Sequence, residues 1–169
     1  MPKLVLPSVK YKKSFLEDFL PSVDQNWDSW GKYWEKKVLI KKDFIAFVRF
    51  IKSFTRGKNL PKGYPPQTVY WLVKENKFLG YLSIRHKPTL QGHIGYEIST
   101  KFQGHGYGKL ILKLGLKKAK ALGIKNVLLT CDATNIRSKR VIESNGGEFE
   151  GSSSQGKGKP RKLKYWIKT

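Results

Sequence analysis

A cluster of glycines is the segment of this chain whose residue types and spacing point most directly to chemistry. It lies in Ile98-Ser-Thr-Lys-Phe-Gln-Gly-His-Gly-Tyr-Gly-Lys109, between an expected strand and an expected helix. A glycine-rich turn exposes successive backbone N–H groups, and a helix N-terminus adds unpaired donors and the positive end of its dipole. Such a turn can hold a pyrophosphate without a dedicated side chain. The segment therefore predicts a phosphate-binding loop, against the alternative of a turn that merely joins strand to helix.

Two widespread phosphate loops do not fit this segment. A P-loop requires Gly-x-x-x-x-Gly-Lys-Ser/Thr, but Gln103 stands where the first glycine belongs and Leu110 follows Lys109. The dinucleotide fingerprint Gly-x-Gly-x-x-Gly fails because Gly108 is one residue early for the third glycine. The spacing excludes magnesium-nucleotide binding of the P-loop kind and a dinucleotide fingerprint.

The elements that must position this loop begin with a helical N-terminal part, residues 1–60. Phe15, Leu16, Phe19 and Leu20 form an apolar face that Pro21 is expected to end. A second apolar face recurs at helical spacing and is expected to stop at Gly57; it consists of Phe44, Phe47, Val48, Ile51 and Phe54. Between the two, an aromatic stripe favours core packing over a stacking platform for a base or sugar; it consists of Trp27, Trp30, Tyr33 and Trp34.

The chain changes character after the ordered loop expected at 60–66. Alternating apolar residues predict three strands in an antiparallel meander, Thr68–Lys74, Phe78–Arg85 and His93–Ser99. A helix Tyr107–Leu122, a buried strand Asn126–Cys131, a helix Asn135–Ser144 and a last strand near Leu163–Ile167 follow, with a mobile loop at 151–161. This order predicts an α+β or three-layer α/β fold, with helices on both faces of a central sheet.

Length and composition favour one globular domain over residues 1–169. No apolar stretch reaches the ~18 residues of a membrane span, and the first residues do not resemble a signal peptide, so we expect a cytoplasmic protein without a membrane partner. Cys131 is the only cysteine and the three histidines lie far apart, which predicts no metal site.

The chain is strongly positive, because it contains 34 Lys and Arg but only 12 Asp and Glu, which gives a net charge of +22. Such a field favours anionic partners, namely phosphorylated cofactors, nucleic acids or anionic lipids. A lysine-rich surface that only aids solubility explains the same numbers equally well.

Within this framework the loop resembles a known family. Gln103-x-x-Gly106-x-Gly108, between a strand and a long helix, resembles the Arg/Gln-x-x-Gly-x-Gly/Ala signature of the GNAT superfamily of N-acetyltransferases, whose loop wraps the pyrophosphate of acetyl-CoA. The helix that begins Asn135-x-x-Ser138 and the turn Asn145-Gly-Gly147 resemble the superfamily's next motifs, and the resemblance covers residues 68–169. Further segments look like those of a bacterial group of predicted acetyltransferases: Leu60-Pro-Lys-Gly-Tyr, Ser83-Ile-Arg-His86, Gly92-His-Ile-Gly-Tyr96, Thr130-Cys-Asp132 and Tyr165-Trp-Ile167.

The resemblance implies a mixed, mostly antiparallel sheet in which the fourth strand, His93–Ser99, splays from the fifth, Asn126–Cys131. The pantetheine arm of acetyl-CoA would insert between them like an extra strand. The backbone of Ile98 would then face the pantetheine and acetyl group, and Asn135 would lie near the pantetheine amides. The pyrophosphate would lie on Gln103, Gly104, His105, Gly106, Tyr107 and Gly108.

The resemblance leaves the acid and base open. Many members carry a tyrosine seven residues after the helix asparagine to protonate the departing thiolate, but that position is Ile142 here. His93 and Glu97, on the splayed strand, are the candidates for deprotonating the ammonium directly or through water. The alternatives are a hydrogen-bonding histidine and an ion-paired Glu97. Asp132 could help to cap the helix that follows it.

Taken together, these residues predict an acetyl-CoA-dependent N-acetyltransferase, without a metal, that acts on a primary amine of a small molecule or peptide. The alternative is a basic nucleic-acid or ribosome-associated module that retains the fold, because no acidic residue occurs from Ile98 to Cys131 and the end, Lys157 to Lys168, is basic. Nucleic-acid binding is expected to be nonspecific. We expect a monomer or homodimer, and the sequence does not identify the acceptor amine.

Overall fold

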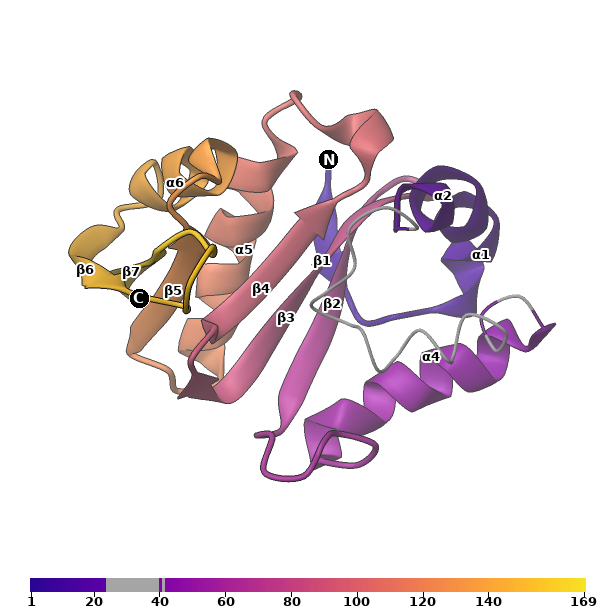
Figure 1. The fold of residues 1–169 in the computed structure, drawn as a ribbon. Helices are drawn as coiled ribbons and strands as arrows, with labels where there is room; N and C mark the ends of the chain where they lie inside the picture. Colours follow the sequence, from indigo (N-terminus) through magenta and orange to yellow (C-terminus); the bar gives the residue numbers. More distant parts are fainter. Residues whose placement is uncertain (24–39, 41) are drawn as a thin grey trace.

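The computed structural model describes residues 1–23, 40 and 42–169 of the chain. They form one seven-stranded sheet in the order β1-β2-β3-β4-β5-β7-β6 (Figure 1). The strands are β1 (Lys3–Val5), β2 (Gln67–Lys74), β3 (Lys77–Thr89), β4 (Gly92–Ile98), β5 (Asn126–Asp132), β6 (Glu148–Ser153) and β7 (Lys162–Lys168). Antiparallel ladders join β1, β2, β3 and β4, each to the next, in one half of the sheet. In the other half, β7 pairs with both β5 and β6. The expected meander and mostly antiparallel sheet are confirmed.

The two halves of the sheet meet only briefly. β4 and β5 share one registered pair, Gly92 with Leu129, and the strands of the described residues show no further pairing between them. Gly92 has φ +74, and a Cβ there would lie 2.5 Å from the carbonyl oxygen of Leu128, so glycine is required for this close approach. The expected splay between the fourth and fifth strands is therefore present.

Helices of the N-terminal part cover one face of the sheet, as Figure 1 shows. The first runs through α1 (Lys12–Ser14), a π-helical turn (Phe15–Phe19) and α2 (Leu20–Val23); α4 (Phe44–Ser53) continues into a 3₁₀ turn (Phe54–Arg56). The carboxylate of Asp43 accepts the N–H of Ala46 at the start of α4, and Gly57, at φ +70, ends it as expected. Their apolar residues pack on Trp71 and Phe78 of the sheet.

The opposite face carries α5 (Tyr107–Ala121) and α6 (Ile136–Glu143). Buried Ile111, Leu112 and Ala119 of α5 and Ile142 of α6 share a second core with the sheet. Helices thus lie on both faces, which confirms the three-layer arrangement.

Three expectations about the elements are wrong. Pro21 does not end its helix, because the N–H of Leu20 already bonds the carbonyl of Phe15 five residues back; this wider turn tolerates the missing proline donor. Residues 1–60 are not all helical, because β1 pairs with β2. The loop expected from residue 151 begins later, because β6 pairs with β7 as far as Ser153.

The aromatic stripe from Trp27 to Trp34 lies outside the described residues. Among the residues that the structure covers, no helix is long and apolar enough to cross a membrane.

Candidate active site

A cavity of about 860 Å³ lies between the end of β4, the glycine loop and α6. Such a volume is in the range of sites for small molecules and cofactors. The residues that line it are Tyr96, Glu97, Ile98, Thr100, Gln103, Gly104, Gly106, Gly108, Lys109, Asn135, Arg137, Ser138, Arg140 and Val141. It therefore brings together Glu97 and most of the residues expected to hold the cofactor, namely Ile98, Gln103, Gly104, Gly106, Gly108 and Asn135.

The glycine loop has a conformation that only glycine adopts without strain. Gly104 and Gly106 have φ +82 and +77, and nothing within 4 Å would meet a Cβ at either position. Their backbones therefore face open space, as a phosphate-binding turn requires. Gly106 also stands directly before the first residue of α5, where the helix offers unpaired N–H groups.

Gly108 has a different reason to be glycine. A Cβ there would lie 3.2 Å from Cγ2 of Val141, so Gly108 allows α6 to pack close to the start of α5. The two helices together form one wall of the cavity.

Gln103 fixes the loop to its surroundings through its side chain. Its Nε2 donates to the carbonyl oxygen of Ile98 at 3.0 Å, and its Oε1 accepts from a guanidinium nitrogen of Arg137 at 2.8 Å. The amide thus links the end of β4 to α6 across the loop. Gln103 holds the loop in shape as well as lining the cavity.

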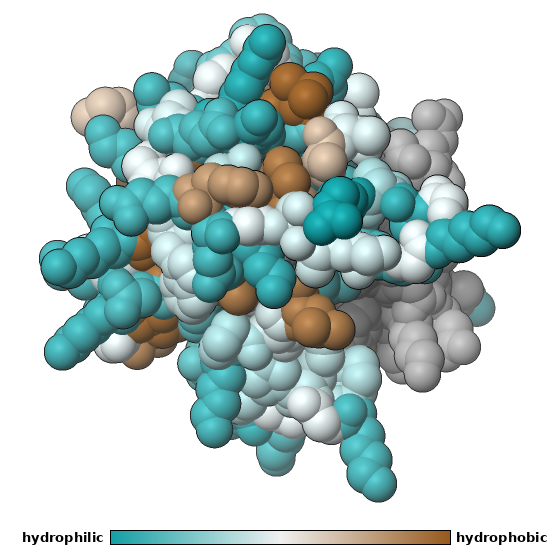
Figure 2. All heavy atoms as spheres, turned by 60° about the vertical axis from the view of Figure 1, so that its left-hand side comes forward, coloured by the Kyte–Doolittle hydropathy of each residue, from teal (hydrophilic) through white to brown (hydrophobic). Residues whose placement is uncertain are grey.

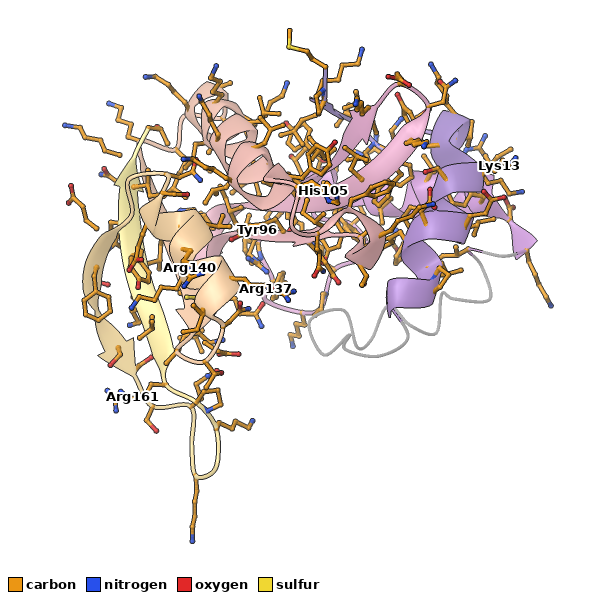
Figure 3. The ribbon with its side chains drawn as sticks, turned by 90° about the horizontal axis from the view of Figure 1, so that it is seen from above. Lys13, Tyr96, His105, Arg137, Arg140 and Arg161 are labelled. Atoms are coloured by element: carbon orange, nitrogen blue, oxygen red, sulfur yellow. The ribbon has the colours of Figure 1, made fainter. Side chains whose placement is uncertain are left out.

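His105 and Tyr107, also expected to contact the cofactor, do not line the cavity. The exposed His105 ring lies near Tyr107, with ring centroids 6.3 Å apart, and its Nδ1 is 2.9 Å from the carbonyl oxygen of Gln103. Tyr107 packs against the core beneath α5 and α6, whereas His105, labelled in Figure 3, is exposed.

Positive charge gathers at the cavity. Lys109 from α5 and Arg137 and Arg140 from α6 all line it, and the two arginines lie on the side of α6 seen in Figure 3. Cations here complement the donors of the loop and favour a ligand with several phosphate charges. Lys113, Lys117 and Lys120 are exposed and do not line the cavity.

Asn135 serves α6 as its N-cap. Its Oδ1 accepts the N–H of Ser138 at 3.0 Å, which satisfies one of the unpaired donors of the first turn. The expectation that Asp132 caps this helix is wrong, because its carboxylate pairs with Lys162 at 2.6 Å and accepts from Gln155 at 2.8 Å. Both contacts lower the pKa of Asp132, the hydrogen bond from Lys162 most.

The edge of β4 that faces the cavity is open. The N–H of Ser99 donates to the carbonyl of Leu79 at 2.9 Å, which places the backbone groups of Ser99 toward β3. Because these groups alternate along a strand, those of Tyr96 and Ile98 point away from β3, to the side where β5 has separated. The carbonyl of Ile98 accepts from Gln103 on this side, so the N–H of Ile98 and the backbone groups of Tyr96 make the edge that a ligand would meet. An extended ligand with amide groups can pair with such an edge.

Glu97 and Tyr96 lie on opposite faces of β4. Glu97 is opposite Tyr81, which belongs to the core under the N-terminal helices, and the hydroxyl of Tyr81 donates to Glu97 Oε2 at 3.4 Å. Tyr96 packs instead against the core beneath α5 and α6. Glu97 is half-buried and lines the cavity, so its carboxylate is placed to receive a proton there.

His93 lies elsewhere. It is 6% exposed, its Nδ1 accepts the N–H of Leu128 at 2.9 Å, and it does not line the cavity. Burial lowers the pKa of His93, and the nearby guanidinium of Arg85 lowers it further. The neutral imidazole joins β4 to β5 beside their single registered pair.

Tyr96 and Ser138 line the cavity but were not expected from the sequence. Their hydroxyl oxygens lie 3.2 Å apart, and Figure 3 shows Tyr96 beside α6. Burial raises the pKa of Tyr96 to about 12. Strand alternation could have placed Tyr96 opposite to Glu97, but nothing in the sequence showed which core aromatic would reach the cavity.

The residues of the site include no obvious metal ligands. Among the described residues, no group of three or more His, Cys, Asp and Glu side chains lies close enough to hold a metal ion.

Known structures share this arrangement. A structure described as RimL, a ribosomal L7/L12 alpha-N-protein acetyltransferase in complex with coenzyme A, has a TM-score of 0.67 and 19% identity over 99% of this chain and 93% of its own. The microcin C7 self-immunity acetyltransferase MccE, in complex with acetyl-CoA and AMP, has a TM-score of 0.64 and 15% identity over 99% of this chain and 92% of its own. An acetyltransferase from Salmonella typhimurium that modifies the N-terminal serine of L7/L12 has a TM-score of 0.60 and 19% identity over 99% of this chain and 95% of its own. At these identities the likeness is one of fold.

Sequence comparison identifies the family. No curated protein sequence matches the chain. The family model described as acetyltransferase (GNAT) domain matches residues 12–148, which is most of the chain and includes β4, the glycine loop, α5 and α6. The chain belongs to the GNAT acetyltransferase family and is an acyltransferase.

Proposed function

We propose that this protein transfers the acetyl group of acetyl-CoA to a primary amine of a small molecule or peptide. The observation that carries the proposal is the continuity of one cavity from the open edge of β4 to the glycine loop. The edge suits the amides of a pantetheine arm, and the loop with its cations suits a pyrophosphate. Relatives of the same fold hold coenzyme A or acetyl-CoA.

The residues of this chain would act mainly by positioning. The backbone of Ile98 would align the thioester beside β4, and Gly104 and Gly106 would fix the phosphates. Asn135, on the same wall, would keep the first turn of α6 in place.

Of the two proposed bases, Glu97 is the residue that lines the cavity, so we assign it the removal of a proton from the ammonium. The neutral nitrogen then attacks the carbonyl carbon, a C–N bond forms and the C–S bond breaks. His93 would support this step by holding β4 and β5 at the point where they separate.

The acceptor class follows less directly. Two of the similar structures are described as acting on the amino terminus of a ribosomal protein, and a third as a microcin self-immunity enzyme. The fold therefore serves peptide and other amines alike. We keep the acceptor of this chain at a primary amine.

Calorimetry with acetyl-CoA tests the first half of the proposal, and we expect micromolar binding. The second half is tested by incubating the protein and acetyl-CoA with a panel of amines and short peptides while a thiol reagent detects free CoA. Acetylated product must appear by mass spectrometry in step with the thiol. A protein that binds neither acetyl-CoA nor CoA would refute the proposal.

Nucleic acid is the second candidate ligand, because the net charge is +22. The face in Figure 2 carries hydrophilic side chains with hydrophobic ones scattered among them. Since lysines extend from Lys3 to Lys168 rather than gathering in one segment, we propose nonspecific binding only.

A further inference from the structure

The departing sulfur of acetyl-CoA needs a group that stabilises its negative charge. In enzymes that this chain resembles, a tyrosine on the helix after the fifth strand provides it, but Ile142 occupies that position and is 1% exposed within the core. An isoleucine can neither donate a hydrogen bond nor hold a proton. Another residue of the cavity wall would have to supply the donor.

Tyr96 approaches the same helix from the strand. Its hydroxyl lies 3.2 Å from Oγ of Ser138, which is one helical turn before Ile142 on α6. Both residues line the cavity, and the Tyr96 ring packs against the core beneath α5 and α6. The strand thus brings a phenol to the side of α6 from which the family's tyrosine is missing.

The open edge of β4 lies between this phenol and Glu97. Neighbouring side chains of a strand point to opposite faces, and here both line one cavity because β5 has separated from β4. A thioester held along the edge by the backbone of Ile98 would have a carboxylate on one face and a hydroxyl on the other. The amine and the sulfur would then be served from opposite sides.

We propose that the hydroxyl of Tyr96 donates a hydrogen bond to the sulfur of CoA as it leaves, and so replaces the tyrosine that α6 lacks. This inference rests on the proposed function. Ser138 is the positioning residue: when its own hydroxyl proton points to the Tyr96 oxygen, the phenol proton is directed away from α6.

Tyr96 acts by hydrogen bonding and keeps its proton. Its pKa is raised to about 12 by burial, whereas an ordinary thiol has a pKa of ~8.5, so a thiolate does not take this proton. The ammonium loses a proton to Glu97, which passes it to water. The nitrogen attacks, and its second proton then leaves to the regenerated carboxylate of Glu97 and on to water. The C–S bond breaks with the electron pair on sulfur, and the thiolate, once released, takes one proton from water.

The test compares CoA with desulfo-CoA, which lacks the sulfur but keeps every phosphate and amide. Affinities are measured by calorimetry at pH 7 and pH 9, in a Cys131→Ser background because Cys131 lies near Tyr96 and is itself a thiol. Lys109, Arg137 and Arg140 line the cavity and act on both ligands alike. The difference between the ligands therefore isolates the sulfur.

We expect the preference for CoA over desulfo-CoA to increase by about tenfold from pH 7 to pH 9, as the bound thiol ionises and accepts a charged hydrogen bond. Tyr96→Phe should abolish this increase while binding desulfo-CoA within about twofold of the parent, on the same principle. Tyr70→Phe, at a half-buried tyrosine of β2 that does not line the cavity, is the matched control and should keep the increase.

Three outcomes overturn the inference. Tyr96→Phe could keep the pH-dependent preference, or the parent could show none, and in either case Tyr96 does not meet the sulfur. Loss of desulfo-CoA binding in Tyr96→Phe would mean that the phenol only shapes the cavity. Failure of the parent to bind either ligand is a different result, because it refutes the proposed function itself.

Discussion

The Nδ1 atom of His93 accepts the backbone N–H of Leu128 at 2.9 Å, directly beside the residue pair that joins β4 to β5. The bond requires an imidazole that is unprotonated at Nδ1. It secures the sheet at the base of the separation between the two strands. This relationship gives His93 the hydrogen-bonding role that was the alternative to a catalytic base.

We expect His93→Leu to lower the free energy of unfolding by about 1–3 kcal/mol, because the buried N–H of Leu128 would lose its acceptor. His93→Asn offers an amide oxygen in a similar place and should recover much of this loss. Urea denaturation at pH 7.5 measures both. Equal destabilisation by the two variants would argue against the hydrogen bond as the cause.

The burial of His93 predicts a pH dependence. The pKa of His93 is lower in the folded protein than its ordinary 6.5, so the unfolded chain binds the proton more readily. The stabilisation is complete above about pH 6.5 and is lost as pH falls through the folded pKa. Urea denaturation from pH 7.5 to pH 5 should therefore show a smaller decline for His93→Asn than for the parent; parallel declines would contradict the assignment.

Turnover should separate the two candidate bases. Once an acceptor is found, Glu97→Gln should lower kcat by ~10²-fold or more and remove the acidic limb of the pH–rate profile, because Glu97 lines the cavity. Glu148→Gln, on exposed β6, is the control. An unchanged profile in Glu97→Gln would exclude this carboxylate from proton removal.

Gly106→Val should weaken acetyl-CoA binding at least tenfold, or about 1.4 kcal/mol. A valine side chain would occupy the open space over the loop, and φ +77 is strained for any L residue. Gly123→Val is matched to it, since Gly123 has φ +79 and also has nothing within 4 Å of its Cβ position. If calorimetry shows that both variants bind alike, backbone strain and not the loop accounts for the effect.

Asn135→Ala should cost about 1 kcal/mol of stability by removing the cap of α6, and Asn135→Ser should retain most of it. Thermal unfolding measures the cap, and calorimetry with acetyl-CoA measures the contact to the ligand. A variant that binds normally while unfolding earlier would restrict Asn135 to capping.

Salt should distinguish the anionic ligands. Affinity for a nonspecific duplex DNA should fall steeply between low and physiological salt, because scattered lysines contribute through a screened field. The affinity for acetyl-CoA should fall less, since salt does not screen the hydrogen bonds from the backbone donors of the loop and the β4 edge in this way. Fluorescence anisotropy for DNA and calorimetry for acetyl-CoA give the comparison, and tight, sequence-selective DNA binding at physiological salt would reverse this order.

Local signals explain which parts could be predicted from the sequence. The glycine loop, α5 and the meander carry strong turn chemistry or regular apolar periods, and the structure has them near their expected bounds. β1 has only three residues, too few to show alternation, and β6 contains the polar run Gly151-Ser-Ser153, which resembles a loop. Their strand form depends on pairing with β2 and β7, which is not encoded locally.

The candidate site was predictable where backbone conformation decides it. Gly104 and Gly106 have positive φ, and glycine is the residue type that such a turn requires, so their presence in the sequence pointed to the loop. His93 and Glu97 are four residues apart, so their different positions relative to the cavity depend on where along β4 the separation from β5 begins, and the place of Tyr96 depends on how α6 packs. Such packing emerges only in three dimensions.

The gap in the sheet has a mechanical consequence. In the described residues, the parts β1–β4 and β5-β7-β6 of the sheet are joined by one residue pair at Gly92, by the imidazole of His93 and by the core that they share beneath α5 and α6. A ligand whose backbone bonds to the edge of β4 would add a further connection between these two parts of the sheet. Ligand binding would then stiffen the sheet across the gap, so that its two parts would move together as far as the outer strands.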